Sequence, residues 1–305
     1  MDAECHKALK IMRVGGWDFM RSALLRAAGV LCVLALLPMF LPEARAHQDL
    51  LARIALLTEQ IRTNGSSAEL LVQRADLYRN HQDWVPALWD YDAAEKASTN
   101  SAVVDLGRAL TLAGLGKWVE ARDVFDRVVQ DNPTNAAALL GRARVLVQLD
   151  QPALAIADYE RAFTNLASPH PEDYLERARL QAAQSDPAAA VKGLDEALAR
   201  LGWMVTLQLQ AMDYEQACGN YDGALTRLET IISRSNRSEG WLQLKGEILQ
   251  KAGQTADARA AFHAALKAID DLPPRFARSE NMIKLRTQIE ASLASLGTAI
   301  RFTSP

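Results

Sequence analysis

Residues Ala102 to Asn135 read AVVDLGRALTLAGLGKWVEARDVFDRVVQDNPTN. Apolar residues recur at helical spacing on both sides of Gly116–Lys117, which predicts two short amphipathic helices joined by a tight turn. Asn132 and Pro133 then end the second helix. A hairpin of this size cannot bury its own apolar face, so it predicts copies of itself along the chain.

The copies recur at intervals of about 34 residues along the chain. The small residue of the second helix recurs at spacings of 34, 34, 35, 34 and 34, as Ala87, Ala121, Ala155, Ala190, Ala224 and Ala258. Four residues after each stands a bulky one: Tyr91, Phe125, Tyr159, Leu194, Leu228 and Phe262. In the first helix the close-contact position reads Ala75, Ala109, Ala143, Ala178, Met212 and Gly246. Because these columns agree in phase, the chain is predicted to be a stack of repeated helix pairs.

This pattern resembles the tetratricopeptide repeat (TPR) family, whose unit is a 34-residue helix-turn-helix, over about Ala68 to Asp270. The chain departs from the family late in the first helices of the fourth and fifth units, where Gln181 and Glu215 replace a large apolar residue. Strand signals are absent from the sequence. The resemblance implies an all-α fold, an α-solenoid that winds six TPR units into a right-handed superhelix between capping helices.

The N-terminal segment has the layout of a secretory signal peptide. Two arginines precede an apolar run of 15 residues, Ala27 to Leu41, and the sequence then ends in the small-residue pattern Ala44-Arg45-Ala46. We therefore predict that residues 1–46 are a signal peptide, with Met20 as an alternative translation start. The protein is then expected to be exported to the periplasm or secreted. The alternative is an uncleaved segment that anchors the chain in the inner membrane; after cleavage we expect no stable membrane insertion.

The rest of the chain divides into three predicted parts. Residues 47–66 form an N-terminal capping helix, residues 68–272 the six TPR units, and residues 273–305 a C-terminal capping helix and tail. Capping helices are expected because the ends of a solenoid must be closed with a polar face.

Composition narrows the classes of partner. The 305 residues are 23% charged with a formal net charge of −3, and loss of residues 1–46 would leave 28 basic against 33 acidic side chains. This balance argues against nucleic acid, because phosphate binding needs a basic surface. Cys218 would be the one remaining cysteine of the mature chain, so we expect no internal disulfide, and we expect Cys218 to be a small buried residue at a helix end rather than a reactive thiol.

No catalytic or cofactor motif stands out, so we predict a protein that is not an enzyme and holds no cofactor or structural metal. The five histidines lie far apart, and there is no phosphate-binding glycine loop or CxxC pair. One alternative is copper held by the amine and imidazole of His47, if cleavage exposes them, together with His81 or His170.

The TPR resemblance implies a binding scaffold whose first helices line a concave groove. Two arginines and an apolar floor share this predicted groove: Leu106, Leu110, Leu140, Arg144, Val147, Leu175 and Arg179. Guanidinium groups suit capture of a carboxylate, so we expect a protein or peptide partner with an acidic residue flanked by apolar ones. Alternatively, Arg144 and Arg179 pair with acids such as Glu172 or Glu176. A structural role in self-association or complex assembly at the cell envelope also remains open, and the sequence leaves the oligomeric state undetermined.

Overall fold

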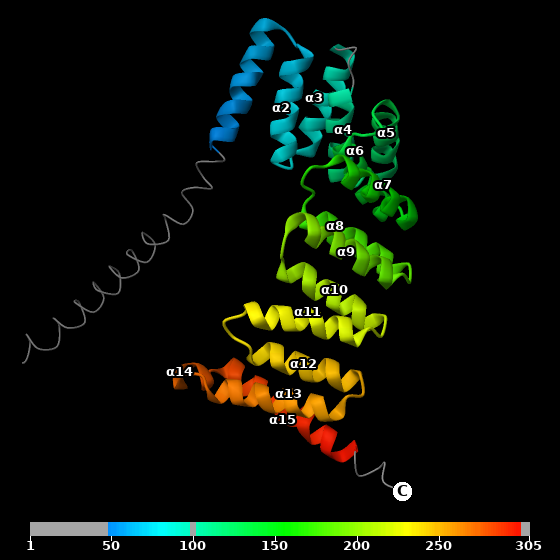
Figure 1. Ribbon diagram of the computed structural model, residues 1–305. Helices are drawn as coiled ribbons and strands as arrows, with labels where there is room; N and C mark the ends of the chain where they lie inside the picture. Colours follow the sequence, from blue (N-terminus) through cyan, green and yellow to red (C-terminus); the bar gives the residue numbers. More distant parts are fainter. Residues whose placement is uncertain (1–47, 98–101, 300–305) are drawn as a thin grey trace, which may run out of the picture. The chain divides into compact units, whose positions relative to one another are not determined.

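The computed structural model describes residues 48–97 and 102–299. The predicted signal peptide and His47 lie outside these residues. Helices joined by turns and short loops make up the described part, in which no strand occurs (Figure 1). The predicted all-α repeat fold is confirmed.

The chain divides into two compact units, with the boundary between Leu115 and Gly116, inside the hairpin with which the sequence analysis began. The first unit contains a helix over residues 48–64, followed by α2 (Ala68–Asn80), α3 (Trp84–Ala97) and α4 (Ala102–Gly114). Its core lies between α2, α3 and α4 and contains Leu71, Ala75, Ala87, Tyr91, Ala94 and Val104.

The second unit continues the alternation of first and second helices. It contains α5 (Trp118–Asp131), α6 (Ala136–Gln148), α7 (Pro152–Asn165), α8 (Pro171–Ala183), α9 (Pro187–Leu201), α10 (Val205–Ala217), α11 (Tyr221–Arg234), α12 (Glu239–Lys251), α13 (Thr255–Asp270), α14 (Pro274–Ala277) and α15 (Glu280–Ala299). Each helix from α5 to α12 packs on the next one in the chain, which Figure 1 shows as a row of neighbouring helices within this unit.

The columns read from the sequence form the core. All six alanines of the second-helix column, from Ala87 to Ala258, are fully buried, and so are the six bulky residues four positions later. Buried apolar area is the main favourable term in folding, and each hairpin gains most of it from its neighbours. The repeat phase therefore determines which face of each helix is inside.

Glycine occurs where a ring needs space. A Cβ atom on Gly141 of α6 would stand 2.4 Å from the Phe125 ring of α5, and one on Gly107 of α4 would stand 2.4 Å from the Tyr91 ring of α3. Gly246 faces Phe262 in the same way at 2.5 Å. The absence of a side chain thus lets a first helix lie directly against an aromatic ring of a second helix.

The turns between paired helices share one backbone conformation. A residue with positive φ stands at the same repeat position in all six: Gln82 (65°), Gly116 (73°), Asp150 (55°), Ser185 (63°), Gly219 (74°) and Gly253 (77°). Glycine adopts this left-handed conformation without strain, whereas the other three residues do so at a cost. The geometry of the turn is therefore a property of the repeat and does not require glycine.

Gln181 and Glu215, which replace a large apolar residue in the fourth and fifth units, differ in their hydrogen bonding. Glu215 is buried, but its Oε2 atom accepts a hydrogen bond from Nε of Arg227 at 2.9 Å, and Arg227 also pairs with Asp195 at 2.8 Å. The Oε1 atom of Gln181 is buried without a hydrogen-bond partner among the described residues. A charged network thus replaces the large apolar side chain in the fifth unit.

The expectation for Cys218 is wrong. Cys218 follows α10 as its C-cap and is exposed. The reason is positional: the core-facing residues of α10, such as Ala211 and Met212, end one turn earlier, and the chain is already turning at Gly219.

At the C-terminal end, α15 packs on α13. Ile289 and Leu296 of α15 are buried in a cluster with Phe262, Ala265 and Ile269 of α13. The long last helix therefore covers the apolar face that α13 would otherwise expose.

Candidate functional site

The predicted groove residues lie on three first helices. Leu106 and Leu110 are half-buried on α4, which belongs to the first compact unit. Leu140, Arg144 and Val147 lie on α6, and Leu175 and Arg179 on α8, all in the second unit.

A cavity of about 350 Å³ opens between α6, α7 and α8. Its lining combines cations, an acid and apolar groups: Arg144, Val147, Gln148, Tyr159, Glu176, Arg179 and Leu180. Three of the predicted residues, Arg144, Val147 and Arg179, thus meet in one cavity. Leu140 and Leu175 do not line it; they pack against the core cluster of this unit, as do Val147 and Leu180.

Arg144 is held by two acids from α8. Its guanidinium lies 2.6 Å from Asp173 and 3.3 Å from Glu176, and the Asp173 side chain is only 2% exposed. Burial disfavours the charge of Arg144, but the nearby Glu176 and Asp173 carboxylates outweigh burial and raise its pKa above the usual value. Arg144 therefore neutralises a buried carboxylate, and its charge is largely compensated within the protein.

Arg179 differs from Arg144 in this respect. It is exposed at the cavity and makes no hydrogen bond or ion pair within the part of the chain that the structure describes. Its charge acts on Tyr214: burial raises the pKa of that hydroxyl, and Arg179 partly opposes the rise. Arg179 is thus a guanidinium with its donors available to a ligand.

Tyr159 holds Glu176, the acid that also pairs with Arg144. The buried hydroxyl of Tyr159 donates to Glu176 at 2.5 Å, and burial followed by this bond raises the pKa of the hydroxyl. The first unit repeats the arrangement, with the hydroxyl of Tyr91 donating to Asp76 at 2.6 Å. Tyr159 is not among the residues predicted for the groove, although a tyrosine at a core position indicates that its hydroxyl needs a polar partner.

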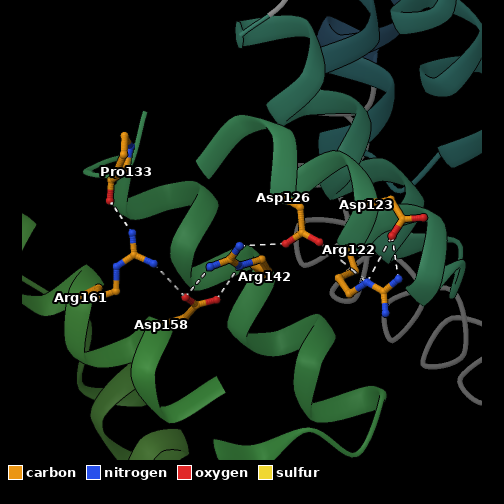
Figure 2. A network of polar contacts seen from close by, with 7 residues as sticks. All are labelled: Arg122, Asp123, Asp126, Pro133, Arg142, Asp158 and Arg161. Atoms are coloured by element: carbon orange, nitrogen blue, oxygen red, sulfur yellow. Dashed lines mark hydrogen bonds and ion pairs between the residues drawn. The ribbon is translucent and has the colours of Figure 1, made fainter. Parts of the chain in front are cut away.

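A second cavity, of about 420 Å³, is lined by charged residues of α5, α6 and α7. Figure 2 shows their contacts: Arg142 forms a fork with both oxygens of Asp158 at 2.7 Å and also reaches Asp126 at 2.8 Å. Arg122 pairs with Asp123 at 2.7 Å, and Arg161 lies 3.6 Å from Asp158. Because every arginine of this network lies near at least one carboxylate, with Asp158 shared by Arg142 and Arg161, the network joins neighbouring helices and its cations are already compensated within the protein.

The described residues give no sign of a metal centre or a membrane span. No group of three or more histidine, cysteine, aspartate or glutamate side chains is arranged to hold a metal ion among them. No helix in residues 48–97 or 102–299 combines the length and apolar character needed to cross a bilayer. The copper hypothesis depends on His47, which lies outside the described residues.

Comparison with known proteins identifies the repeat. The family model described as "Tetratricopeptide repeat-like domain" matches residues 121–287, more than half of the chain. No curated protein matches the chain in sequence.

Two solved structures show the same fold. The C-terminal part of a TPR repeat-containing protein from Cytophaga hutchinsonii is 13% identical, with a TM-score of 0.62 over 79% of this chain and 95% of that one. The structure of Naa15/Naa10 bound to HypK-THB is 16% identical, with a TM-score of 0.56 over 76% of this chain and 36% of that one.

Proposed function

Because the chain belongs to the tetratricopeptide repeat-like family, whose fold supports a role as a protein-interaction scaffold, we propose that it is a non-enzymatic, exported adaptor. It binds a segment of a partner protein in the cavity between α6, α7 and α8. A structure of similar fold, Naa15/Naa10, was determined bound to HypK-THB, which agrees with use of this fold for protein binding.

One observation carries the proposal: the exposed guanidinium of Arg179 has no hydrogen-bond or ion-pair partner among the described residues and stands beside the apolar side chains of Val147 and Leu180. An arginine binds a carboxylate through two parallel hydrogen bonds, and apolar walls favour an apolar neighbour in the same ligand. The partner segment therefore presents an acidic residue flanked by apolar ones. Arg179 receives the carboxylate, while Arg144 stays with Asp173 and Glu176.

Binding is tested with a charge reversal at Arg179. We expect Arg179→Glu to abolish capture of partner proteins from a cell-envelope extract, with unchanged helicity and thermal midpoint. The matched control is Lys192→Glu, which reverses an exposed cation on α9 and should leave capture intact. Arg144→Glu is unsuitable, because loss of the cation beside the buried Asp173 would cost about 3–5 kcal/mol of folding free energy.

Two outcomes would contradict this assignment. Retention of the same proteins by Arg179→Glu would exclude the cavity as the binding site. A mature protein that captures nothing but forms larger oligomers as its concentration rises in light scattering would favour the self-association role instead.

Export rests on the basic, apolar and small-residue layout of residues 1–46. N-terminal sequencing of the protein from its native compartment should give His47 as the first residue. Recovery of an intact segment in the membrane fraction would favour the anchored alternative.

A further inference from the structure

The first helices of four repeats carry an arginine at the same position; among the described residues three of these arginines pair with carboxylates through two or more nitrogens, and the fourth through one nitrogen alone. The four residues are Arg74, Arg108, Arg142 and Arg177. In their own hairpins, Arg74 and Arg142 donate through Nε and a terminal nitrogen to both oxygens of one buried aspartate, Asp90 and Asp158, with all four distances 2.7 Å. Arg108 pairs with Asp92 and Glu95 of the preceding helix at 2.9 Å.

Arg177 on α8 has no aspartate of this kind. The residue sixteen positions later, where the hairpins of Arg74 and Arg142 have Asp90 and Asp158, is Gly193. The Arg177 side chain is only 5% exposed, its Nε atom is buried without an acceptor, and its one ion pair joins a terminal nitrogen to Glu196 at 3.1 Å. A buried guanidinium with unused donors is costly, because those donors have given up water without gaining a partner.

The surroundings of Arg177 form a cavity of about 400 Å³ between α7, α8 and α9. The rings of Phe163 and Tyr174 stack on each other with centroids 4.2 Å apart, and the guanidinium lies over them at 5.0 and 5.6 Å. A flat guanidinium stacks favourably on aromatic faces, so these contacts hold the Arg177 cation in a fixed orientation.

A second arginine in the same cavity, Arg200, pairs with no carboxylate among the described residues. It donates to the carbonyl oxygens of Phe163 and Leu166 at 2.8 and 2.5 Å and to the Tyr174 hydroxyl at 3.1 Å, all of them neutral acceptors. Of the two acids in the lining, Glu196 pairs with Arg177, and Glu160 forms no ion pair with either arginine within the described part of the chain. Two cations and two acids make the cavity formally neutral, so an entering anion does not meet a net negative charge.

We propose that this cavity is a binding site for a carboxylate group supplied by another molecule. The ligand's carboxylate accepts hydrogen bonds from the Arg177 guanidinium inside the cavity, as Asp158 does from Arg142, a pairing visible in Figure 2. The site is separate from the cavity that contains Arg179, so it neither requires nor replaces the proposed groove.

The experiment follows the Nε–H signals of the arginine side chains by NMR in the full-length protein. Acetate, a glutamate-containing peptide amide and inorganic phosphate are each added at constant ionic strength, with sodium chloride as the reference. We expect the Arg177 signal to shift in a saturable way with acetate or the peptide, and the Arg142 signal to stay in place, since Arg142 already holds Asp158. A response to the peptide but not to acetate would identify a protein side chain as the source, whereas a response to acetate would extend the site to small organic acids.

Gly193→Asp supplies the missing carboxylate from within the chain. A Cβ at this position would lie 2.4 Å from the Nη2 atom of Arg177, so the guanidinium has to move aside before it pairs with the new carboxylate. We expect the variant to fold, to show a shifted Arg177 signal without any ligand, and to lose the acetate response. Glu172→Gln, at an exposed acid of α8 that does not line the cavity, should keep that response.

The proposal is overturned if the wild-type Arg177 signal ignores both carboxylate probes, or moves equally in sodium chloride. A response to phosphate alone would also overturn it, since the ligand would then be of another class. Should Gly193→Asp fail to fold, the wild-type titration against the Arg142 signal still gives the answer.

Discussion

Phe125→Ala tests the repeat packing at the point where the structure is most explicit. The Phe125 ring on α5 is fully buried, and it lies against Gly141 of α6 so closely that a Cβ there would be 2.4 Å from a ring atom. Truncation removes the ring and opens a cavity directly beside a glycine. The informative partner change is therefore Gly141→Ala, alone and in combination.

The magnitudes follow from this geometry. Phe125→Ala should cost about 3–5 kcal/mol through lost burial and the cavity. Gly141→Ala alone forces a methyl group into the ring at a cost of about 1–3 kcal/mol, partly offset by about 1 kcal/mol of better helix propensity. In the double variant the ring is gone, so the alanine fits and contributes its propensity. We expect the double variant to be more stable than Phe125→Ala by up to about 1 kcal/mol, which corresponds to a coupling of about 1–3 kcal/mol.

Local measurements are needed because stacked repeats can unfold in parts, so that one global midpoint does not describe the loss. Amide hydrogen exchange in α5 and α6 reports the free energy of unfolding of these helices. Urea unfolding, monitored by circular dichroism, supports this measurement. Val119→Ala on the same helix is the control; this side chain is 53% exposed and its loss should change stability by less than about 0.5 kcal/mol.

Additive effects of Phe125→Ala and Gly141→Ala would refute the reasoning, since they would mean that ring and glycine do not share one contact. A negligible effect of Phe125→Ala would go further and exclude the repeat phase itself.

Two further predictions concern a turn and a titrating group. Gly253→Ala should lower the free energy of unfolding in urea by about 1 kcal/mol, because a Cβ there meets no atom within 4 Å and the backbone strain at φ +77° is the one penalty. Asp150→Gly, at φ 55° in the equivalent turn, should instead raise the free energy of unfolding by up to about 1 kcal/mol. Equal effects of the two changes would contradict the shared left-handed turn. Partial burial, opposed by Lys251, raises the pKa of Asp213 in the folded protein above 3.8. At a pH above this raised pKa the ionised carboxylate therefore destabilises the folded state. This loss of stability disappears as the pH falls toward 3.8, where the carboxyl group is protonated. Asp213→Asn should therefore stabilise the protein slightly at pH 7 and have no effect in acid, and an unfolding midpoint that favours the wild type at pH 7 would contradict this sign.

The arrangement of the core was predictable because it depends on local periodicity. Small and bulky residues recur every 34 positions, and each column faces inward for the same reason that the first one does, namely that a hairpin buries its apolar side only against its neighbours. The left-handed turn was visible at Gly116 but not at Asp150 or Ser185, whose side chains give no sign that the backbone there has positive φ. The turn is imposed by the packing of two helices rather than by the residue in it.

The polar sites depended on the tertiary structure. The sequence placed Arg144 and Arg179 in equivalent positions, yet Arg144 reaches Asp173, 29 residues away, while Arg179 has no partner in the described part of the chain. Whether two charged side chains form an ion pair depends on the distance between them across neighbouring hairpins. The repeat period of the sequence does not give that distance. Arg177 shows the same limit: the sequence shows that Gly193 stands where Asp158 follows Arg142, but only the structure shows that the Arg177 guanidinium is buried with an Nε atom that has no acceptor among the described residues.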